Sequence, residues 1–341
     1  MTMNKSFQPT IRDIAREAKV SIATVSRYLN MPEKVRKETG ERIQRIIDKH
    51  NYRCNFAAKA LATQRTKTIG YIIPAVNNQI YSECARGVQD EAQLHGYQVF
   101  IASAEYNRQR EKQMVENFLE RRVDGIILTV SDSMGDIAQK LFQEKIPAVN
   151  LFNKQGCLPC VSVDNVKASY DATEYLIKLG HRSFAMLGVP FTASDRCRMR
   201  YEGFLHCLQD HDIPTHPQSF VQISSNTLDC SEGVEKLMNS SNPPTAIFAS
   251  NDLVAINTIS ALRRLGFEIP KDVSVIGFDD IPMAKHVWPP LTTVLQPGYR
   301  MGRQATAVVL DILRTGKHPE EKIPPVQHDL IIRESSGVPP R

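Results

Sequence analysis

Residues 10–30 read Thr10-Ile-Arg-Asp-Ile-Ala-Arg-Glu-Ala-Lys-Val-Ser-Ile-Ala-Thr-Val-Ser-Arg-Tyr-Leu-Asn30, which is the pattern of two short helices joined by a tight turn. Thr10 followed by Asp13 is a capping-box start for the first helix. The apolar residues of this helix recur at helical spacing and predict one buried stripe, made of Ile11, Ile14, Ala15 and Ala18. Val20 then marks the bend between the helices.

The second helix carries the side chains that could read a DNA sequence. Ser21 can cap this helix, and Val25 and Leu29 face inward. The opposite side of the helix is then exposed near its N-terminal end and holds Ile22, Ala23, Ser26 and Arg27. A recognition helix inserts this end into the major groove. An ordinary amphipathic helix pair would show the same capping and periodicity, so these two signals alone leave that alternative open.

Positive charge is concentrated around this helix pair. Residues 1–65 hold 14 Lys and Arg against 6 Asp and Glu, whereas the remaining residues hold 28 against 31. The formal charge is therefore +8 in the N-terminal part and −3 in the rest. A small basic domain attached to a nearly neutral core suits the neutralisation of DNA phosphates. A basic solvated face is the alternative, but it does not explain why the excess coincides with the helix pair.

The rest of the N-terminal segment is also predicted to be helical. A third helix should run from Lys37 to His50 with a buried stripe of Ile43, Ile46 and Ile47, and Tyr52 closes this small core. Residues 55–62 follow as a good helix former that is too short to be stable alone in water. The length of 341 residues suffices for about two or three domains. We predict a helix-turn-helix domain at 1–53, a hinge helix and linker at 54–66, and a larger core at 67–341.

Short apolar runs alternate with longer helical patterns in the core, as in parallel α/β sheets. The predicted strands are Thr68–Ile73, Gln98–Ala102, Gly125–Leu128, Ala148–Leu151, Phe184–Leu187, Thr245–Ala249 and Val273–Ile276, with helices such as Tyr81–His95 and Asp252–Leu265 between them. Breaks near Asp164 and Pro297 are consistent with two lobes connected by several crossovers.

The N-terminal stretch resembles the lactose-repressor/galactose-repressor family of bacterial transcription regulators in Asp13-Ile-Ala, Ala18, Val20-Ser21 and Thr24-Val-Ser-Arg27. The resemblance continues at Tyr52, Ala58 to Leu61, Ile69-Gly70, Asp124-Gly-Ile-Ile127, Gly180-His-Arg182, Gly203-Phe204, Asn251-Asp252, Val275-Ile-Gly-Phe-Asp-Asp280 and Pro289-Pro-Leu-Thr-Thr-Val294. The chain departs from the family pattern at Lys19, where the turn usually has Gly or Asn, and at Cys54, where the hinge normally has Pro. Arg36 and Gly40 weaken the start of the third helix.

This resemblance implies both a fold and a function. The fold is an N-terminal all-α helix-turn-helix domain plus an α/β core, a two-lobed parallel-sheet effector domain like periplasmic binding proteins. The function is that of a transcriptional regulator, by expectation a repressor, that binds double-stranded, pseudo-palindromic operator DNA as a homodimer. The residues expected at the DNA are Thr10, Ser21, Ile22, Ala23, Thr24, Ser26, Arg27, Asn30, Tyr52, Asn55, Ala58 and Leu61. Leu61 stands where the family wedges a leucine into the minor groove, whereas without the resemblance a plain linker helix would be favoured.

A ligand site is expected in the core. Ligands of open parallel sheets bind beyond the carboxyl ends of the strands, and polar residues follow the predicted strands here. They are Asn77, Asn78, Ser103, Ser131, Asn150, Asp164, Asn165, Asn251, Asp252, Asp279 and Gln296. Such side chains match the hydroxyls of a small polyol, and a sugar is the natural expectation. Each Asn or Asp taken alone is more often a turn or helix-cap residue.

The resemblance narrows this set, because Arg200 and Asp279 stand at the effector-binding arginine and aspartate of the family. The expected effector-binding residues are Tyr81, Asp164, Arg196, Arg200, Asn251, Asp279 and Gln296. We expect Arg200 and Asp279 to face each other across the cleft between the lobes. The cluster of Arg196, Arg198 and Arg200 would suit a phosphorylated sugar, although one or two of these arginines could be solvated helix-face charges. Leu228 falls where many members carry a ring-stacking aromatic residue.

Two rival functions have weaker support. An enzymatic function has little support, because the sequence lacks the motifs that usually carry catalytic chemistry. It has no GxGxxG after a strand, no GxxxxGK[ST], no HExxH and no GxSxG. His181, followed by Arg182 near a helix end, is more often structural than catalytic. A transport-type sugar receptor without DNA binding would fit the core alone, but the first 65 residues and the absence of a signal sequence argue against it.

The remaining expectations concern location, cysteines and assembly. With no apolar run long enough to span a membrane, the protein is expected in the cytoplasm and away from membranes. The scattered cysteines 54, 84, 157, 160, 197, 207 and 230 suit reduced thiols, and the lone Cys157-Leu-Pro-Cys160 is interpreted as structural. No metal and no cofactor are expected. The absence of leucine heptads near the C-terminus predicts a dimer, and the effector is expected to be an inducer.

Overall fold

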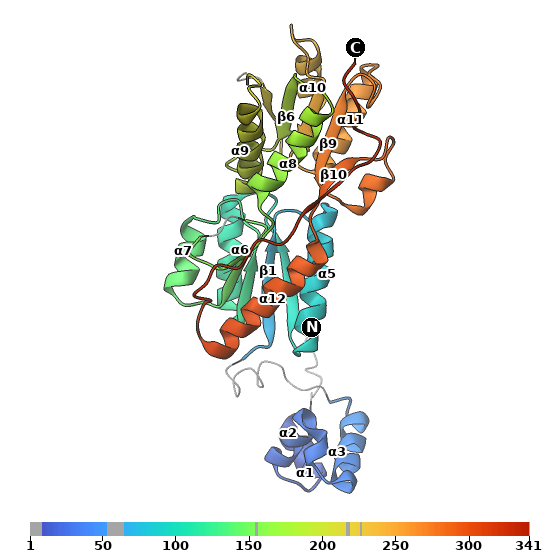
Figure 1. Cartoon of the computed structure of the whole chain (residues 1–341). Helices are drawn as coiled ribbons and strands as arrows, with labels where there is room; N and C mark the ends of the chain where they lie inside the picture. Colours follow the sequence, from blue (N-terminus) through green and yellow to red (C-terminus); the bar gives the residue numbers. More distant parts are fainter. Residues whose placement is uncertain (1–8, 53–64, 154–155, 216–218, 226, 341) are drawn as a thin grey trace, which may run out of the picture. The chain divides into compact units, whose positions relative to one another are not determined.

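The computed structural model describes residues 9–52, 65–153, 156–215, 219–225 and 227–340. The chain divides into two compact units, Met1–Thr66 and Lys67–Arg341 (Figure 1). The expected DNA contacts Asn55, Ala58 and Leu61 lie outside the described residues.

The N-terminal unit is a small three-helix core. Its elements are α1 (Ile11–Glu17), α2 (Ile22–Asn30), the short 3₁₀ helix η1 (Pro32–Lys34) and α3 (Lys37–Lys49). Thr10 and Asp13 form the predicted capping box, and the Ser21 hydroxyl accepts a hydrogen bond from the Thr24 N–H. The buried side chains come from all three α-helices and are Ile14, Ala15, Ala18, Val25, Ile43 and Ile46. Tyr52 packs against this core, as predicted.

Two residues that depart from the family pattern have clear structural surroundings. Lys19 has a φ of 53°, the left-handed conformation that Gly and Asn adopt most readily in such a turn. Gly40 lies in α3, where an added Cβ would come within 2.8 Å of the Tyr28 ring. The glycine therefore admits the Tyr28 ring, while α3 still begins at Lys37 although Arg36 offers no side-chain cap.

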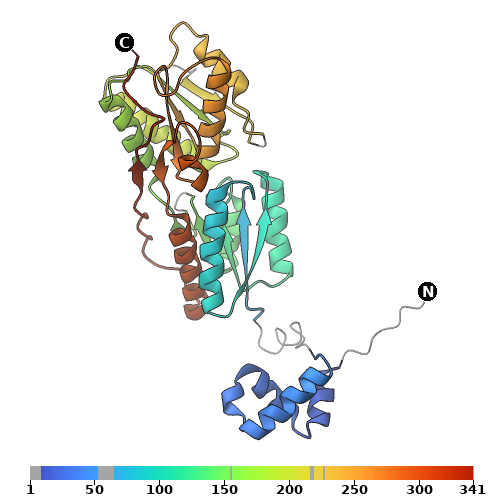
Figure 2. The same cartoon turned by 90° about the vertical axis from the view of Figure 1, so that its right-hand side faces the viewer.

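The larger unit contains two lobes, each built on one sheet (Figures 1 and 2). The N-lobe has a parallel sheet in the order β2-β1-β3-β4-β5. Its strands are β1 (Thr68–Ile73), β2 (Gln98–Ser103), β3 (Gly125–Leu128), β4 (Ala148–Leu151) and β5 (Cys160–Val161). Its helices are α5 (Gln79–Leu94), α6 (Arg108–Glu120), α7 (Asp136–Gln143) and α12 (Gly298–Thr315), and α5 and α12 lie side by side.

The C-lobe has a sheet in the order β11-β10-β9-β8-β6-β7, in which only β11 runs antiparallel to its neighbour among the described strands. Its strands are β6 (Phe184–Gly188), β7 (Phe220–Gln222), β8 (Ala246–Ala249), β9 (Ser274–Asp279), β10 (Thr292–Leu295) and β11 (Asp329–Ile331). Its helices are α8 (Asn165–Lys178), α9 (Asp195–Asp210), α10 (Ser231–Met238), α11 (Asp252–Arg264) and the 3₁₀ helix η3 (Pro282–Lys285).

The chain passes between the lobes after β5, after β10 and again between α12 and β11. The first two passages coincide with the sequence breaks near Asp164 and Pro297. Phe152, Ser250 and Gln296 each directly follow a parallel strand, and they come from both lobes. The carboxyl ends of strands from the two sheets thus contribute to one region, which is where a parallel-sheet protein places a ligand.

Candidate functional site

The first candidate site is the exposed face of α2. Ile22, Ala23 and Arg27 are exposed, and Ile22 keeps 45% of its surface accessible although it is a large apolar residue. Thr24 and Ser26 are half-buried. Such a face offers an apolar contact for thymine methyl groups and one guanidinium for a guanine.

Several hydroxyl and amide groups near this face are already engaged within the unit. The Thr10 hydroxyl donates to Asp13 at 2.7 Å, and the Ser21 hydroxyl lies 2.9 Å from that of Thr24. The Asn30 amide donates to the Ser26 carbonyl at 2.8 Å. These groups fix the ends of the helices, so they could position α2 without contacting a base.

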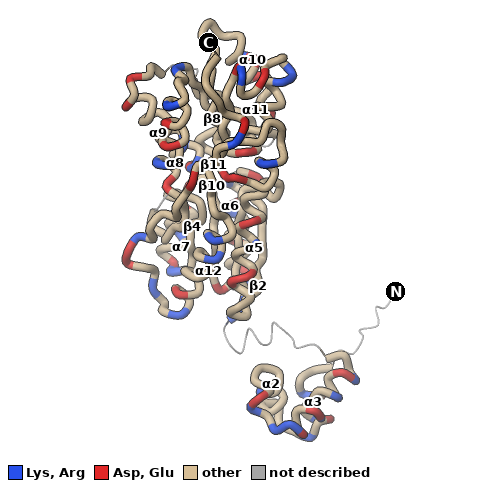
Figure 3. The backbone as a smooth tube through the Cα atoms, turned by 45° about the vertical axis from the view of Figure 1, so that its right-hand side comes forward, with Lys and Arg blue, Asp and Glu red and all other residues tan. Residues whose placement is uncertain are grey.

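The charges of the N-terminal unit are partly paired. Residues 9–52 hold ten Lys and Arg against six Asp and Glu, and Figure 3 shows both kinds of position along this part of the tube. Glu17 accepts from Lys49 at 2.6 Å and from His50 at 2.5 Å, and these bonds hold the pKa of its carboxyl below the ordinary value. No acidic side chain among the described residues pairs with Arg27, which leaves its cation available to DNA.

The second candidate site is a hollow between the two lobes of the larger unit. In this arrangement the hollow is narrow, with about 20 Å³ of space for the centre of a water molecule. The N-lobe contributes Asn78, Ile80, Tyr81, Tyr106 and Phe152, and the C-lobe contributes Val189, Ser194, Arg196, Cys197, Arg200, Ser250, Asn251, Asp279 and Gln296. The N-lobe wall is therefore mainly apolar and aromatic, whereas the C-lobe wall is mainly polar.

Arg200 is held in place by several contacts within the C-lobe. Its Nε donates to the Asn165 side-chain oxygen at 2.9 Å, and its Nη1 donates to the Ser250 carbonyl. Its Nη2 lies 3.7 Å from an oxygen of Asp279, and the guanidinium stacks 3.6 Å from the centre of the Phe278 ring. Burial lowers the pKa of Arg200, and the Asp279 carboxylate opposes that change.

The expected geometry of this pair was wrong. Arg200 lies on α9 and Asp279 at the end of β9, and both belong to the C-lobe. They form one wall of the hollow and do not face each other across the cleft. Arg196 does reach across, since its Nη1 donates to the carbonyl of Val130 in the N-lobe at 2.9 Å, and Asp279 interacts with the Asn78 side chain of the N-lobe.

Two buried side chains beside this pair keep polar atoms without a hydrogen-bond partner. The Nη2 of Arg196 and the Oε1 of Gln296 are both unpartnered, and the two residues are only 4% and 3% exposed. The other amide atom of Gln296 donates to Asp279 at 2.6 Å. The hollow therefore presents an unused donor of Arg196 and an unused acceptor of Gln296 at its polar wall, and the Ser250 hydroxyl there is unpartnered as well.

The aspartate itself occupies a strained position. Asp279 has a φ of 125° and Asp280 a φ of 51°, conformations that non-glycine residues rarely adopt. Burial raises the pKa of the Asp279 carboxyl, and Arg200 opposes this rise. The nearby Asp252 carboxyl, which accepts from the Ile281 N–H at 2.8 Å, has a raised pKa for the same reason.

The other expected effector residues are divided between the hollow and its surroundings. Tyr81 lines the hollow and packs edge-to-face on Phe152, with ring centres 5.7 Å apart. Asn251 also lines it, although its side chain caps α11. Asp164 does not line the hollow: it is exposed and caps α8 through the Lys167 N–H, while its neighbour Asn165 holds Arg200.

Some members of the site had no signal of their own in the sequence. Tyr106 and Phe152 line the hollow, yet each follows its strand as an ordinary loop residue. Arg198, which was grouped with Arg196 and Arg200, is exposed and does not line the hollow. Leu228 packs at the edge of the main core instead.

The Cys157 and Cys160 pair carries no metal-site geometry. The Cys160 thiol is buried and donates to the Asn153 carbonyl at 3.0 Å. No cluster of three or more potential metal ligands occurs within the described ranges. No helix of the described residues is long and apolar enough to cross a membrane.

Comparison with known proteins decides the family. Residues 10–55 match the model of bacterial regulatory proteins of the lacI family, and residues 173–336 match a periplasmic binding protein-like domain. The transcriptional regulator RegA of Clostridium saccharobutylicum is 35% identical over 96% of this chain and 99% of its own length. The chain belongs to the LacI family. The transcriptional repressor CytR of Escherichia coli K12 is 32% identical over 97% of each chain.

Solved structures agree with this fold. The lac repressor dimer bound to operator and the anti-inducer ONPF gives a TM-score of 0.85 over 97% of this chain and 99% of that chain, at 23% identity. A complex of the transcriptional regulator CelR with cellobiose gives a TM-score of 0.70 over 96% of this chain and 100% of that chain, at 25% identity. Because RegA and CytR are transcriptional regulators, this LacI-family chain is a transcriptional regulator with a helix-turn-helix DNA-binding domain and is not an enzyme.

Proposed function

We propose that this LacI-family regulator is a repressor that binds a pseudo-palindromic operator as a homodimer and is controlled by a small carbohydrate or sugar-phosphate effector. The observation that carries the proposal is the polar wall of the interlobe hollow, where buried Arg196 and Gln296 keep unpartnered atoms beside the Arg200–Asp279 pair. The CelR–cellobiose complex supports a sugar in this class of protein.

The unpartnered atoms favour a ligand with hydroxyl groups. A buried donor or acceptor that lacks a partner costs roughly 1–3 kcal/mol, so a ligand that satisfies it gains that energy on binding. The free Nη2 of Arg196 needs an acceptor and the free Oε1 of Gln296 needs a donor. A hydroxyl group supplies both functions, and a sugar carries several hydroxyls at fixed spacing.

The opposite wall favours a ring. Tyr81, Tyr106 and Phe152 present aromatic side chains to the hollow from the N-lobe. A sugar ring has an apolar face of C–H groups and a polar rim, which matches an aromatic wall on one side and charged side chains on the other. A phosphate on the sugar would fit the two guanidiniums, but Asp195 at 3.6 Å from Arg196 and Asp279 at 3.7 Å from Arg200 already offset their charge.

Homodimer formation is supported by an exposed apolar edge of the N-lobe. β2 is the edge strand of the five-stranded sheet, and Phe100 and Ile101 on it are 45% and 41% exposed. Leu94, which ends the neighbouring α5, is also exposed. An unprotected apolar edge strand invites association, and a second copy of the chain would bury it. Two copies related by a two-fold axis present two α2 helices, which requires a pseudo-palindromic operator.

We assign base contacts to Ile22, Ala23 and Arg27, and supporting contacts to Thr10, Ser21, Thr24, Ser26, Asn30 and Tyr52 of the same unit. The exposure of the first three side chains supports their role. Asn55, Ala58 and Leu61 remain proposed DNA contacts from the resemblance alone. The effector is proposed to be an inducer, so that its binding lowers operator affinity.

A thermal-shift screen tests the ligand class. The full chain is heated with neutral mono- and disaccharides, cellobiose among them, and with sugar phosphates. A ligand at 100 times its dissociation constant should stabilise the protein by about 2.7 kcal/mol. Gln296→Met removes the unused acceptor and should weaken this stabilisation, whereas Arg198→Ala, at an exposed arginine of the same region, should not.

The proposal fails if no hydroxylated ligand stabilises the wild type, or if a stabilising ligand acts equally on Gln296→Met. Selection of bound sequences from random DNA tests the operator independently. An enriched two-fold symmetric sequence is expected, and recovery of unrelated sequences would contradict sequence-specific binding by a dimer.

A further inference from the structure

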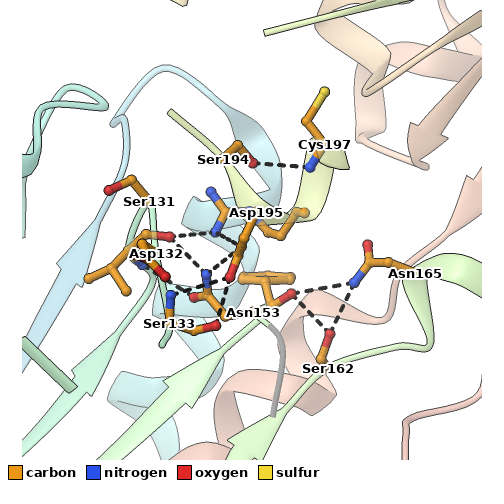
Figure 4. Close-up of polar contacts among 12 residues, drawn as sticks. Ser131, Asp132, Ser133, Asn153, Ser162, Asn165, Ser194, Asp195 and Cys197 are labelled. Atoms are coloured by element: carbon orange, nitrogen blue, oxygen red, sulfur yellow. Dashed lines mark hydrogen bonds and ion pairs between the residues drawn. The ribbon is translucent and has the colours of Figure 1, made fainter. Parts of the chain in front are cut away.

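The first turn of α9 docks into the N-lobe through Asp195 (Figure 4). The Ser133 hydroxyl donates to one carboxylate oxygen of Asp195 at 2.7 Å, and the Ser133 N–H donates to the same oxygen at 3.3 Å. The Asn153 amide donates to the other oxygen at 2.8 Å. The Asp195 N–H in turn donates to the carbonyl of Ser131 at 3.1 Å. A single C-lobe residue thus bonds three residues that follow β3 and β4 of the N-lobe.

The next residue extends this contact into the ligand site. The Nη1 of Arg196 donates to the Val130 carbonyl of the N-lobe. The same buried side chain also lines the hollow, where its Nη2 has no hydrogen-bond partner. The neighbouring Asp195 carboxylate lies 3.6 Å from the Arg196 guanidinium. The interlobe contact and the ligand site therefore share one side chain.

The N-lobe side of the contact is held by bonds that do not involve α9. Buried Glu111 accepts from the Ser131 N–H at 2.7 Å and from its hydroxyl at 2.9 Å. The Asn153 side chain accepts from the Val130 N–H at 3.2 Å and donates to its carbonyl at 2.8 Å. The receiving loop is thus shaped within the N-lobe, so docking of α9 requires little rearrangement.

These contacts differ from the bonds at the ligand-binding arginine. Arg200, Asp279 and Asn165 all lie on C-lobe elements and bond mainly to one another, and Asp279 reaches the N-lobe only through the Asn78 side chain among the described residues. On another side of the interlobe region, the Met283 N–H donates to the Gln79 side chain at 3.2 Å, and that bond is exposed. The part-buried, charge-assisted bonds at Asp195 are the stronger kind of interlobe contact.

We propose that Asp195 and Arg196, together with Val130, Ser131, Ser133 and Asn153, form a latch that holds the two lobes together through protein contacts alone. On the function proposed above, an effector that touches Arg196 acts on this contact. The latch does not depend on the identity of the effector.

Hydrogen exchange measured by mass spectrometry on the full chain, without ligand, tests the latch. Asp195→Ala removes its acceptor, and Ser133→Ala removes one donor from the other lobe without altering α9. Asp132→Asn is the matched control, because Asp132 lies in the same loop and its side chain bonds, among the described residues, only Met134 and Arg108 of its own lobe. The peptides that report are those covering residues 129–135 and 193–198.

Both latch variants should accelerate exchange in both peptides by about tenfold or more, as expected for loss of hydrogen bonds to a charged group. Exchange in β1 should stay unchanged, which separates lobe opening from global unfolding. Ser133→Ala keeps the test decisive even if Asp195→Ala also frays α9. The proposal is overturned if Ser133→Ala leaves both peptides at the wild-type rate, or if Asp132→Asn accelerates them equally.

Discussion

Removal of the Arg200 side chain should destabilise the core in a pH-dependent way. Arg200→Ala takes away a buried cation that bonds Asn165, Ser250 and Asp279, and it leaves the Asp279 carboxylate buried with less compensation. Breaking a buried ion pair by deleting one partner costs about 3–5 kcal/mol. Folded domains are stable by roughly 5–15 kcal/mol, so the variant should still fold at neutral pH.

The pH dependence follows from Asp279. Burial already raises the pKa of this carboxyl in the folded protein, and Arg200 opposes the rise. Without Arg200 the pKa rises further, so the folded state holds a proton that the unfolded state releases. When the folded-state pKa of an acid lies above its unfolded-state pKa, the protein loses stability as pH rises above the unfolded-state pKa. This loss should be larger in the variant than in the wild type. The stability gap between the two should therefore be largest near pH 8 and smaller near pH 5.

Chemical denaturation at pH 5 and pH 8 measures this gap. Arg198→Ala, an exposed arginine two residues earlier on α9, is the control and should change the free energy of unfolding by less than about 0.5 kcal/mol at both pH values. A gap that stays constant between pH 5 and pH 8 would refute the role assigned to Asp279. A variant as stable as the wild type at pH 8 would refute the buried ion pair.

Three further predictions concern other parts of the chain. Arg27→Ala should weaken binding to the selected operator by about 1–3 kcal/mol while random DNA is little affected, and an equal loss in both gel shifts would contradict base reading. Burial lowers the pKa of His181, so its contribution to the free energy of unfolding should be fully present above pH 6.5 and decrease as pH drops below that value. The free energy of unfolding of His181→Asn should decrease less than that of the wild type between pH 7.5 and pH 5.5. Lys19→Gly should relieve the positive φ and slow exchange of α1 and α2 by roughly 2–5-fold, corresponding to about 0.5–1 kcal/mol, and faster exchange would show that the turn is not strained.

Local chemistry explains why much of the fold could be predicted from the sequence. Thr10 and Ser21 mark the helix starts through their own side-chain bonds, and the strand Thr68–Ile73 is a continuous apolar run with the predicted bounds. Strands with weaker patterns were missed. β5 has two residues and β7 has three, while β10 begins with two buried threonines that do not read as apolar. Such short strands are defined by their neighbours in the sheet.

The site was only partly predictable, because its geometry depends on which helix joins which lobe. Arg196, Arg200 and Asp279 could be selected from the sequence, but their common lobe depends on the tertiary packing of α9 and β9. Glu111 gave no signal at all, since it lies in a highly charged helix and its partner Ser131 is 20 residues away. Its burial is visible only in the folded protein.

Effector control of operator binding is the central claim, and one titration tests it directly. The operator recovered by selection is titrated with the full chain in a gel shift, with and without the sugar that stabilises the protein in the thermal screen. An inducer should raise the dissociation constant for the operator by about tenfold or more, a coupling free energy of about 1.4 kcal/mol or more, and leave binding to random DNA unchanged. An operator dissociation constant that the bound sugar leaves unchanged would contradict the claim.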